Sequence, residues 1–405
     1  MKEKYIFEGK ISSVSYRDNE LFSFDRNNYQ FASYRIYQKE QAGIYFQKGL
    51  ISDEEGFARA RENLVIRPRP YPFTLESGKR SRDKTERILT DKEIMELSKD
   101  CMQYVCDKYP QFTFASDFGQ HRTYTRWTND NGMDYSNTDC AITANLFFKH
   151  KECKDISDGS FVLGMRNFNR EKFMQMADNY LENYEKELEL SEDIIIDMQY
   201  YSLLGMLCES LDGENLTLGT SLLADRVGEK VFSEEFTLLH DVSDEECWFN
   251  QFWDGDGCVL ENDKLVLIDK GRIVTGFADK KTAKKYNIPH TRTAHYDYAD
   301  LPGSGGLNLR IRRSNKTIKE LLKGRLCVIP VEWGGGGFAD NGDYTMPIQC
   351  AMLSDGEKIL GKLPPFTMVS NLFDMFGKDF IGVGADNPIY NDKQMLFRVR
   401  KSEIE

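Results

Sequence analysis

The five histidines are the residues on which hydrolytic metal chemistry could be built, because two imidazoles on one helical face are a common zinc-binding arrangement. None of them begins an H-E-x-x-H sequence. His290 and His295 lie close together and near Asp297 and Asp300, so they are candidates for a metal site carried by a loop. A metal site needs three or four converging ligands, and hydrogen bonding within the loop is the simpler interpretation.

Other catalytic motifs are missing from the sequence. It has no G-x-x-x-x-G-K-[ST] loop for nucleoside phosphates and no G-x-S-x-G elbow for a serine nucleophile. Residues 254–257 read Asp-Gly-Asp-Gly like the start of a calcium loop, but Val259 stands where that loop needs glycine and Leu265 where it needs glutamate. The nine cysteines have no C-x-x-C spacing and are expected to be buried free thiols. The residues alone therefore indicate no self-sufficient active site.

Two glycine-rich loops could admit close backbone approach. Residues 302–306 read Pro-Gly-Ser-Gly-Gly, and residues 333–338 place four glycines between two aromatic residues. Because glycine has no Cβ, a bound peptide or a partner strand can approach such a loop, and a bulge at a sheet corner is the alternative interpretation. The residues predicted to line a peptide cleft or a subunit contact are Trp333, Gly335, Gly336 and Phe338.

The composition is that of a globular protein with an acidic surface. The chain has 405 residues, 40% of them hydrophobic, and a net charge of -12. That charge repels phosphates, so direct nucleic-acid binding is not expected. The N-terminus lacks the apolar segment of a signal peptide, and no window reaches the roughly 18 apolar residues of a membrane span. We therefore expect a cytoplasmic protein with no membrane segment.

The elements that position these residues follow an α+β pattern. Residues 5–37 are rich in aromatic and β-branched side chains, with turn residues at 18–19 and 27–28, which predicts strands. Further strands are predicted at residues 112–115, 121–127 and 140–148. Capping boxes predict helices that begin at Ser52, Thr90 and Thr317. Apolar periodicity predicts two more helices, at residues 171–190 and 200–211.

Three parts are predicted from breaks in these patterns. Prolines at 68, 70 and 72, followed by a charged stretch, interrupt the first pattern, and short strand-like runs dominate beyond residue 241. We predict an N-terminal sheet-and-helix part (1–88), a middle α/β part (89–232) and a β-rich C-terminal domain with mostly antiparallel strands (233–405).

The C-terminal half resembles the TldD/PmbA family through an ordered series of short segments between residues 194 and 388. They are residues 221–231, 238–241, 254–259, 271–273, 282–283, 301–302, 306–309, 318–324, 341–344 and 371–375. The N-terminal part agrees more loosely. Residues 34–47 and 52–63 resemble the family's opening strands and helix, and residues 128–132 resemble its Asn-Ser-x-Gly turn in degenerate form.

In this family the TldD-like subunit carries H-E-x-x-x-H on a helix and a late cysteine that completes a zinc site, whereas the PmbA-like (TldE) subunit carries neither. The resemblance places the corresponding helix at residues 203–213. Cys208 and Glu209 stand where His-Glu would begin, and Gly213 stands at the second histidine. No cysteine follows Cys350. The resemblance thus implies the PmbA-like branch, with Glu209 as the remaining catalytic candidate and Cys208 as a remaining metal candidate.

The family resemblance implies a non-catalytic subunit of a metallopeptidase complex that acts on unfolded or extended peptides, in proteolysis and peptide maturation. It implies a heterodimer with a TldD-like subunit that supplies the zinc, and no cofactor in this chain. The isolated chain could form a homodimer.

Two alternatives remain open. The chain could be a self-sufficient metallopeptidase with an atypical metal site built from Cys208, Glu209 or the pair His290 and His295. It could also be a non-proteolytic binding protein that modulates a target such as DNA gyrase, because the family also bears the older name of gyrase modulator.

Overall fold

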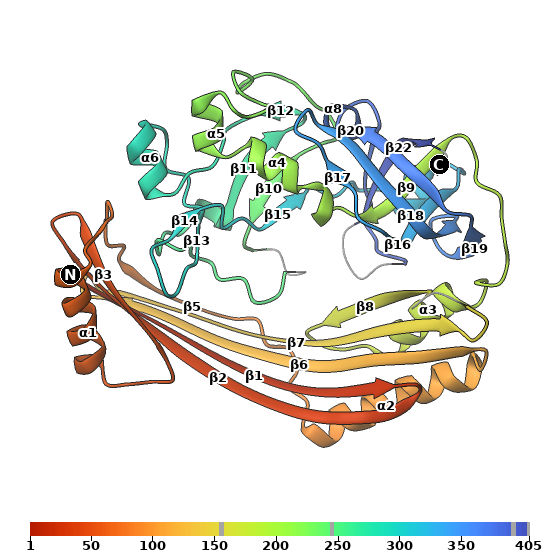
Figure 1. The fold of residues 1–405 in the computed structure, drawn as a ribbon, viewed down its shortest axis with the longest axis horizontal. Coiled ribbons are helices and arrows are strands. Elements are labelled where there is room, and N and C mark those ends of the chain that lie inside the picture. Colours follow the sequence, from red (N-terminus) through yellow and green to blue (C-terminus); the bar gives the residue numbers. More distant parts are fainter. Residues whose placement is uncertain (154–157, 244–246, 390–393, 403–405) are drawn as a thin grey trace.

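The computed structural model describes residues 1–153, 158–243, 247–389 and 394–402, and arranges them in two layers (Figure 1). A long, curved N-terminal sheet forms one layer, and a β-rich C-terminal body lies against its concave side. Antiparallel strands dominate both layers, which confirms the predicted α+β class. None of the helices in the described residues has the length and apolarity that would let it span a membrane.

The N-terminal sheet has the strand order β4-β3-β2-β1-β6-β7-β5, and β8 pairs with β7 beyond that path. Its neighbours are antiparallel except for β5 and β7. β1 pairs with β6 from Glu3 opposite Asn129 to Tyr16 opposite Ser116, so one sheet contains strands from both sides of residue 88. The strands are β1 (Lys2–Arg17), β2 (Glu20–Gln38), β3 (Gln41–Lys48), β4 (Arg69–Pro70), β5 (Gly78–Asp83), β6 (Phe112–Asn129), β7 (Met133–His150) and β8 (Gly159–Met165).

Strand pairing overrides one of the two turns predicted in residues 5–37. The turn at Asp18 and Asn19 is confirmed, because both residues adopt positive φ, 50° and 69°. The predicted turn at Asn27 and Asn28 is wrong, because both residues lie inside β2 and pair with β1. The strands predicted at 112–115 and 121–127 are likewise one continuous strand. Pairing with a neighbouring strand over a long stretch thus outweighs the local preference of these residues for a turn.

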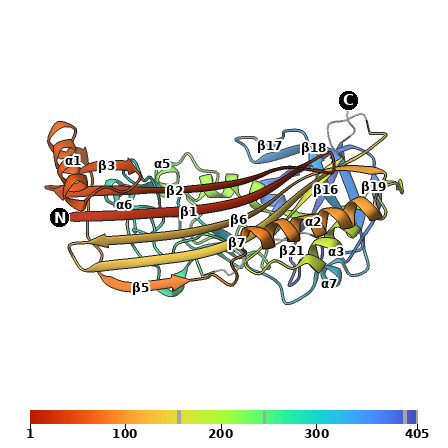
Figure 2. The same cartoon turned by 90° about the horizontal axis from the view of Figure 1, so that it is seen from below.

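Helices cover the two ends of the sheet (Figure 2). α1 (Asp53–Ile66) packs on β2 and β3, while α2 (Asp91–Lys108) and α3 (Arg170–Leu181) pack together at the other end. The predicted capping box at Thr90 is confirmed. Ser52 caps α1 by accepting from the N–H of Glu55 at 3.2 Å, without the second bond of the predicted capping box. The helix predicted at 171–190 ends at Leu181.

Tertiary contacts explain why that helix ends early. The ring of Tyr184 packs against Phe112 with centroids 5.2 Å apart, and its hydroxyl donates to the buried Asp158. The chain therefore turns inward after Leu181, where a continued helix would carry it past these contacts.

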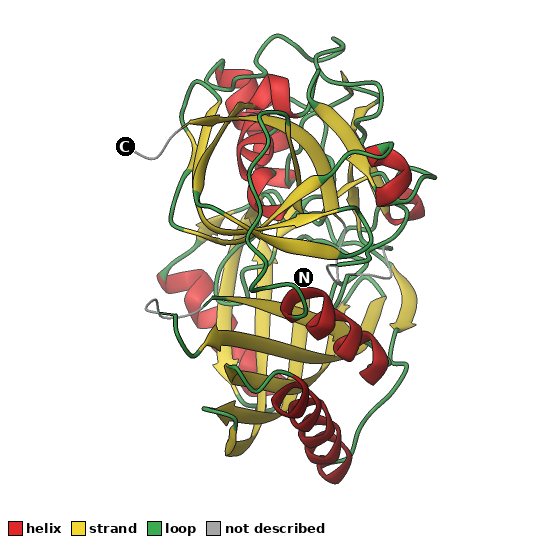
Figure 3. Cartoon of the chain, turned by 90° about the vertical axis from the view of Figure 1, so that its right-hand side faces the viewer, coloured by secondary structure: helices red, strands yellow, loops and turns green. Residues whose placement is uncertain are grey.

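The main sheet of the C-terminal body closes on itself, because β16-β9-β22-β20-β18 are neighbours in order and β18 also pairs with β16 (Figure 3). β9 and β16 are parallel, and the other pairs in this ring are antiparallel. The strands of this sheet are β9 (Ile194–Gln199), β16 (Cys327–Trp333), β17 (Gly337–Phe338), β18 (Asp343–Ser354), β19 (Ile359–Leu363), β20 (Phe366–Asn371), β21 (Phe380–Val383) and β22 (Gln394–Ser402).

A smaller sheet with the order β12-β11-β10-β15 and a two-stranded ribbon, β13-β14, complete the body. Their strands are β10 (Leu238–Asp241), β11 (Lys264–Asp269), β12 (Arg272–Ile273), β13 (Ala294–His295), β14 (Gly303–Ser304) and β15 (Leu309–Ile311). The helices are η1 (Tyr201–Leu203), α4 (Gly205–Ser210), α5 (Gly213–Leu218), η2 (Glu261–Asp263), α6 (Lys280–Tyr286), α7 (Ile318–Leu322) and α8 (Leu372–Met375). The capping box predicted at Thr317 is confirmed.

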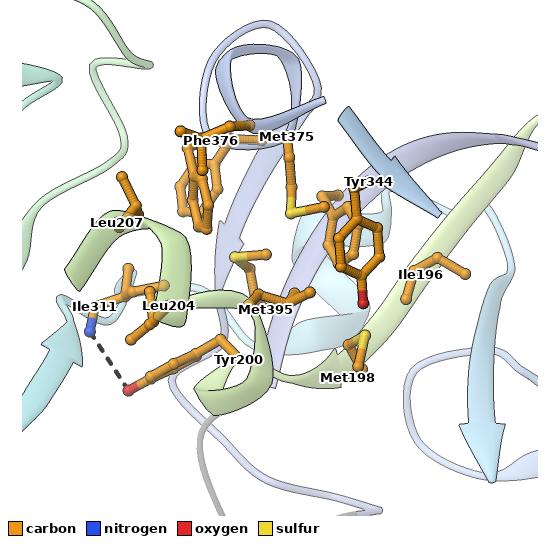
Figure 4. Packing of buried hydrophobic residues seen from close by; sticks show 14 of the residues in the cluster. Ile196, Met198, Tyr200, Leu204, Leu207, Ile311, Tyr344, Met375, Phe376 and Met395 are labelled. Carbon is orange, nitrogen blue, oxygen red and sulfur yellow. Dashed lines mark hydrogen bonds between the residues drawn. The ribbon is translucent and has the colours of Figure 1, made fainter. Parts of the chain in front are cut away.

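An apolar core joins the two C-terminal sheets (Figure 4). Met198 and Tyr200, at the end of β9, pack beside Met395 of β22 and residues of the smaller sheet. The hydroxyl of the buried Tyr200 accepts a hydrogen bond from the backbone N–H of Ile311 at 3.4 Å. The segment after β9, which is the start of the candidate site, is thus fixed by its contacts with both sheets.

A buried ion pair links the N-terminal sheet to the C-terminal body. Arg166, directly after β8, donates from Nε and Nη2 to the two carboxylate oxygens of Asp139, each at 2.8 Å. Arg166 Nη2 also donates to the carbonyl of Cys247, and Asp139 Oδ2 accepts from the N–H of Phe249, both at 2.8 Å. Two charged side chains of the sheet therefore hold the backbone of a C-terminal loop.

We predict that Arg166→Met lowers the free energy of unfolding by about 3–5 kcal/mol, because the substitution leaves the Asp139 carboxylate buried without its partner charge. Urea denaturation followed by circular dichroism measures this change.

The matched control is Arg126→Met, which breaks an exposed bidentate pair with Asp134 whose two bonds are both 2.9 Å long. Exposed pairs contribute at most about 1 kcal/mol. Equal effects of the two substitutions would contradict the role assigned to Arg166.

Candidate functional site

The segment expected to carry the zinc-motif helix is short and interrupted. The single helix predicted at residues 200–211 is instead η1 followed by the six residues of α4, and α5 begins after a break. Asp212 makes the break: its backbone is extended, and its side chain accepts from the N–H groups of Glu214 at 2.9 Å and Asn215 at 3.3 Å. An N-cap at this position starts a new helix, so the two parts of the expected motif lie on different helices.

The motif positions have different surroundings. Cys208 is half-buried against the C-terminal core, and burial raises the pKa of its thiol. The Glu209 side chain is exposed. Gly213 donates its N–H to Phe277 O at 2.9 Å, and a Cβ at Gly213 would lie 2.8 Å from that oxygen. These three residues do not form a common site.

A groove of about 290 Å³ lies between the N-terminal sheet and the C-terminal body. β8 and α3 form one wall, and η1 and β16 form the other. Three large apolar side chains at its rim are exposed: Val162 (48%), Tyr201 (42%) and Trp333 (45%). The described residues that line the groove include no charged side chain. A surface of this kind suits an apolar or main-chain ligand.

Of the four residues predicted to line a cleft, only Trp333 lies at this groove, and the two glycines form a turn. Trp333 lines the groove, whereas Phe338 packs on Tyr344 with ring centroids 4.6 Å apart. Gly335 and Gly336 form the turn between β16 and β17, with φ of 74° and 90°. A Cβ on Gly336 would lie 2.4 Å from Thr345 O in β18, so the close approach of this turn to β18 requires glycine.

A second cavity, of about 400 Å³, lies within the C-terminal body. His295 and Gly306 line it, together with Asp254 and Cys258 from the segment that resembles a calcium loop. His295 is exposed and its Nδ1 lies 3.1 Å from both the N and the O atom of Gly303. A Cβ on Gly306 would lie 2.4 Å from Ala294 O, so this glycine allows close packing within the chain.

The structure groups His290 with Asp254 and Cys258 rather than with His295. One ligand atom from each of the three side chains lies within 4.8 Å of the others. Burial and the neighbouring Asp256 raise the pKa of Asp254 to about 8, and burial raises the pKa of the Cys258 thiol. Within the described ranges this is the one group of three or more potential metal ligands, and it excludes Cys208 and Glu209.

His240 lies at the same cavity as a neutral base. Its Nδ1 accepts a hydrogen bond from the backbone N–H of Asn308 at 2.8 Å, and burial lowers its pKa to about 4. Between pH 6.5 and pH 4 the unfolded chain binds a proton at this position, whereas the folded chain does not.

We therefore predict that His240 makes the protein less stable as the pH falls from 6.5 to 4, by at most about 3 kcal/mol. His240→Asn retains a hydrogen-bond acceptor and removes the titration, so its stability should fall less over this range. Urea denaturation at several pH values compares the two proteins, and identical pH dependence would contradict the assignment.

Sequence reasoning missed Asp254 and Cys258 as members of a site. The sequence indicated only a turn there, and His290 follows more than thirty residues later with no fixed spacing. It also missed Val162 and Tyr201, because nothing in a strand or in an apolar helix pattern indicates that two elements far apart in sequence will form one groove.

Solved structures with the same fold cover nearly the whole chain. TldE from Thermococcus kodakarensis matches with a TM-score of 0.81 and 17% identity, over 99% of this chain and 96% of that one. A proposed modulator of DNA gyrase from Thermotoga maritima matches with a TM-score of 0.79 and 17% identity, over 99% and 95% of the two chains. Another from Bacteroides thetaiotaomicron has a TM-score of 0.77 and 17% identity, over 100% and 94%.

Sequence comparisons agree with the fold. The uncharacterized protein MJ0231 of Methanocaldococcus jannaschii is 22% identical over 267 residues, which are 62% of this chain and 60% of that protein. The family model of the PmbA/TldA metallopeptidase C-terminal domain matches residues 192–396, more than half of the chain. The match begins just before β9 and ends within β22. This chain therefore belongs to the TldD/PmbA family.

Proposed function

We propose that this chain is the PmbA-like, or TldE-like, subunit of a cytoplasmic TldD/PmbA metallopeptidase complex, and that it supplies no catalytic residue. A TldD-like partner would carry the zinc and form a heterodimer with it. None of the nine cysteines, all of which lie in the described ranges, forms a disulfide, which fits a reducing compartment.

The packing around Gly213 is the observation that carries this proposal. In a zinc-bearing relative the second imidazole would project from this position. Here a Cβ would lie 2.7 Å from Ile288 Cδ1 and 2.8 Å from Phe277 O, so no larger side chain fits without rearrangement. Amide hydrolysis in this family uses a zinc-bound water, and a site with Cys208 as its single soft ligand would not hold that zinc.

The groove supports a role in handling extended peptides. β8 pairs with β7 and is the outermost described strand on that part of the sheet. Edge strands can bind peptides through main-chain hydrogen bonds, with neighbouring pockets receiving side chains. Val162, Tyr201 and Trp333 would supply such apolar contacts. The groove begins at η1, directly before the segment that corresponds to the partner's zinc helix.

We predict that the chain alone cleaves no peptide, and that adding it to a matching TldD-like subunit produces peptidase activity. Cleavage of an unfolded, fluorogenic protein substrate is measured with the chain, with the partner and with the mixture. The mixture should lose activity when the glutamate of the partner's H-E-x-x-x-H is replaced by glutamine. Glu209→Gln in this chain should change turnover less than about twofold, because its exposed carboxylate has no metal-bound water to activate.

Cleavage by this chain alone, abolished by Glu209→Gln, would make the self-sufficient enzyme the better account. A mixture that forms a complex but remains inactive on every peptide would favour the non-proteolytic binding protein.

A further prediction concerns the groove. Val162→Arg places a charge among apolar groove residues and should reduce peptide turnover by the mixture at least about tenfold, because burying a charge against an apolar ligand is unfavourable. Val65→Arg is the matched control, since Val65 is 78% exposed on α1, outside the groove.

Size-exclusion chromatography and steady-state kinetics separate the two possible roles of the groove. A raised KM with the complex intact identifies a peptide cleft, and loss of the complex identifies a subunit contact. Equal turnover by both variants and the unmodified complex would contradict either role. The glycines at 335 and 336 suit this test less well, because Gly336 is needed for the close approach of its turn to β18.

A further inference from the structure

We propose that Asp254, Cys258 and His290 bind a zinc ion in the C-terminal body. This inference goes beyond the proposed function, because the site uses none of the family's zinc-helix positions. It also replaces the expectation from sequence that this chain holds no metal.

The three donor atoms are close enough to share one ion. They lie within 4.8 Å of one another, and the ligand atoms of a tetrahedral zinc site are separated by about 3–4 Å. Small side-chain rotations would bring them to that separation. A thiolate sulfur, an imidazole nitrogen and a carboxylate oxygen are a donor set that favours zinc over magnesium or calcium, which prefer oxygen ligands.

The local backbone fixes the Asp254 carboxylate. Its Oδ1 accepts from the N–H groups of Asp256 at 3.0 Å and Cys258 at 2.8 Å, and its Oδ2 accepts from Ala294 N–H at 3.0 Å. Each carboxylate oxygen can take more than one partner, so these bonds orient the ligand and leave it able to bind an ion.

His290 supplies the second independent observation. Its Nε2 is buried and has no hydrogen-bond partner among the residues that the structure describes. Leaving such an atom unpaired costs about 1–3 kcal/mol, so it calls for an explanation in an imidazole that has one ring nitrogen within 4.8 Å of a thiol and a carboxylate. Coordination of a cation by Nε2 provides one.

The charges around the group also balance. The Asp254 carboxylate and a Cys258 thiolate together neutralise one divalent cation. Glu76, whose Oε1 lies 3.2 Å from Cys258 Sγ, pairs with Lys280 at 3.4 Å. Asp256 accepts from the Lys280 backbone N–H at 3.2 Å and from the Tyr71 hydroxyl. An ion therefore need not displace Lys280.

The site is accessible although it is buried. Asp254 and Cys258 both line the 400 Å³ cavity, which gives an entry path and room for a water as the fourth ligand. The site lies where the turn at 254–258 meets the loop that follows α6, so a bound ion would join two segments far apart in sequence.

The experiment uses the isolated full chain, stripped with chelator and dialysed. Zinc is returned in competition with a chromophoric chelator, and bound metal is measured by elemental analysis. Cobalt substitution tests the sulfur ligand through its thiolate charge-transfer absorption. We expect about one zinc per chain. Cys258→Ser and His290→Gln should each weaken binding at least about tenfold, and Cys258→Ser should abolish the cobalt band.

Cys208→Ser and His150→Gln are the matched controls, since they remove the same residue types outside the group and outside the cavity lining, and should keep binding within about twofold. Circular dichroism of the metal-free variants checks their folding. His290→Gln removes no hydrogen bond at Nε2, so it keeps the test valid if Cys258→Ser fails to fold. A folded chain that does not compete for zinc, or binding unchanged in His290→Gln, would overturn the inference.

Discussion

The buried ion pair between Arg166 and Asp139 is the interaction on which the relation between the two layers depends. Asp139 lies in β7 and Arg166 directly follows β8, yet each also hydrogen-bonds the backbone of residues 247–249. Two opposite charges in an apolar interior are tolerated when each satisfies the other and the leftover donors and acceptors find partners. The C-terminal loop provides those partners, so sheet and loop stabilise one another.

The same principle recurs along the sheet. Arg35, which is buried, donates to the carbonyl oxygens of Asp297 at 2.8 Å and Asp300 at 3.1 Å, and Arg82 donates to that of Val242 at 2.8 Å. Arginine suits this task because its planar group donates in several directions at once. The loops that surround the 400 Å³ cavity are therefore held by side chains of the other layer, and this region of the body depends on the sheet for its shape.

Local capping signals predict where helices begin, whereas contacts between distant segments leave no local signal in the sequence. The capping boxes at Thr90 and Thr317 depend on residues three positions apart, and both helices begin as predicted. The prediction of a turn at Asn27 and Asn28 is wrong because these residues pair with β1, and no local pattern encodes that pairing. The groove and the Asp254, Cys258 and His290 group share this limitation, since each joins elements that only the folded topology brings together.

The family resemblance explains why the residues alone indicate no self-sufficient active site. In the proposed role, a subunit without the imidazoles of the zinc helix would not need that helix to be continuous, and Asp212 caps a new helix where the motif would run. Gly213 then packs against Phe277, which closes the space that a second ligand would occupy. The rim formed by Val162, Tyr201 and Trp333 nevertheless stays apolar and exposed beside this segment. Exposed apolar surface of this kind lowers solubility. Its presence therefore favours the interpretation that a peptide or a partner subunit covers these side chains when the protein functions.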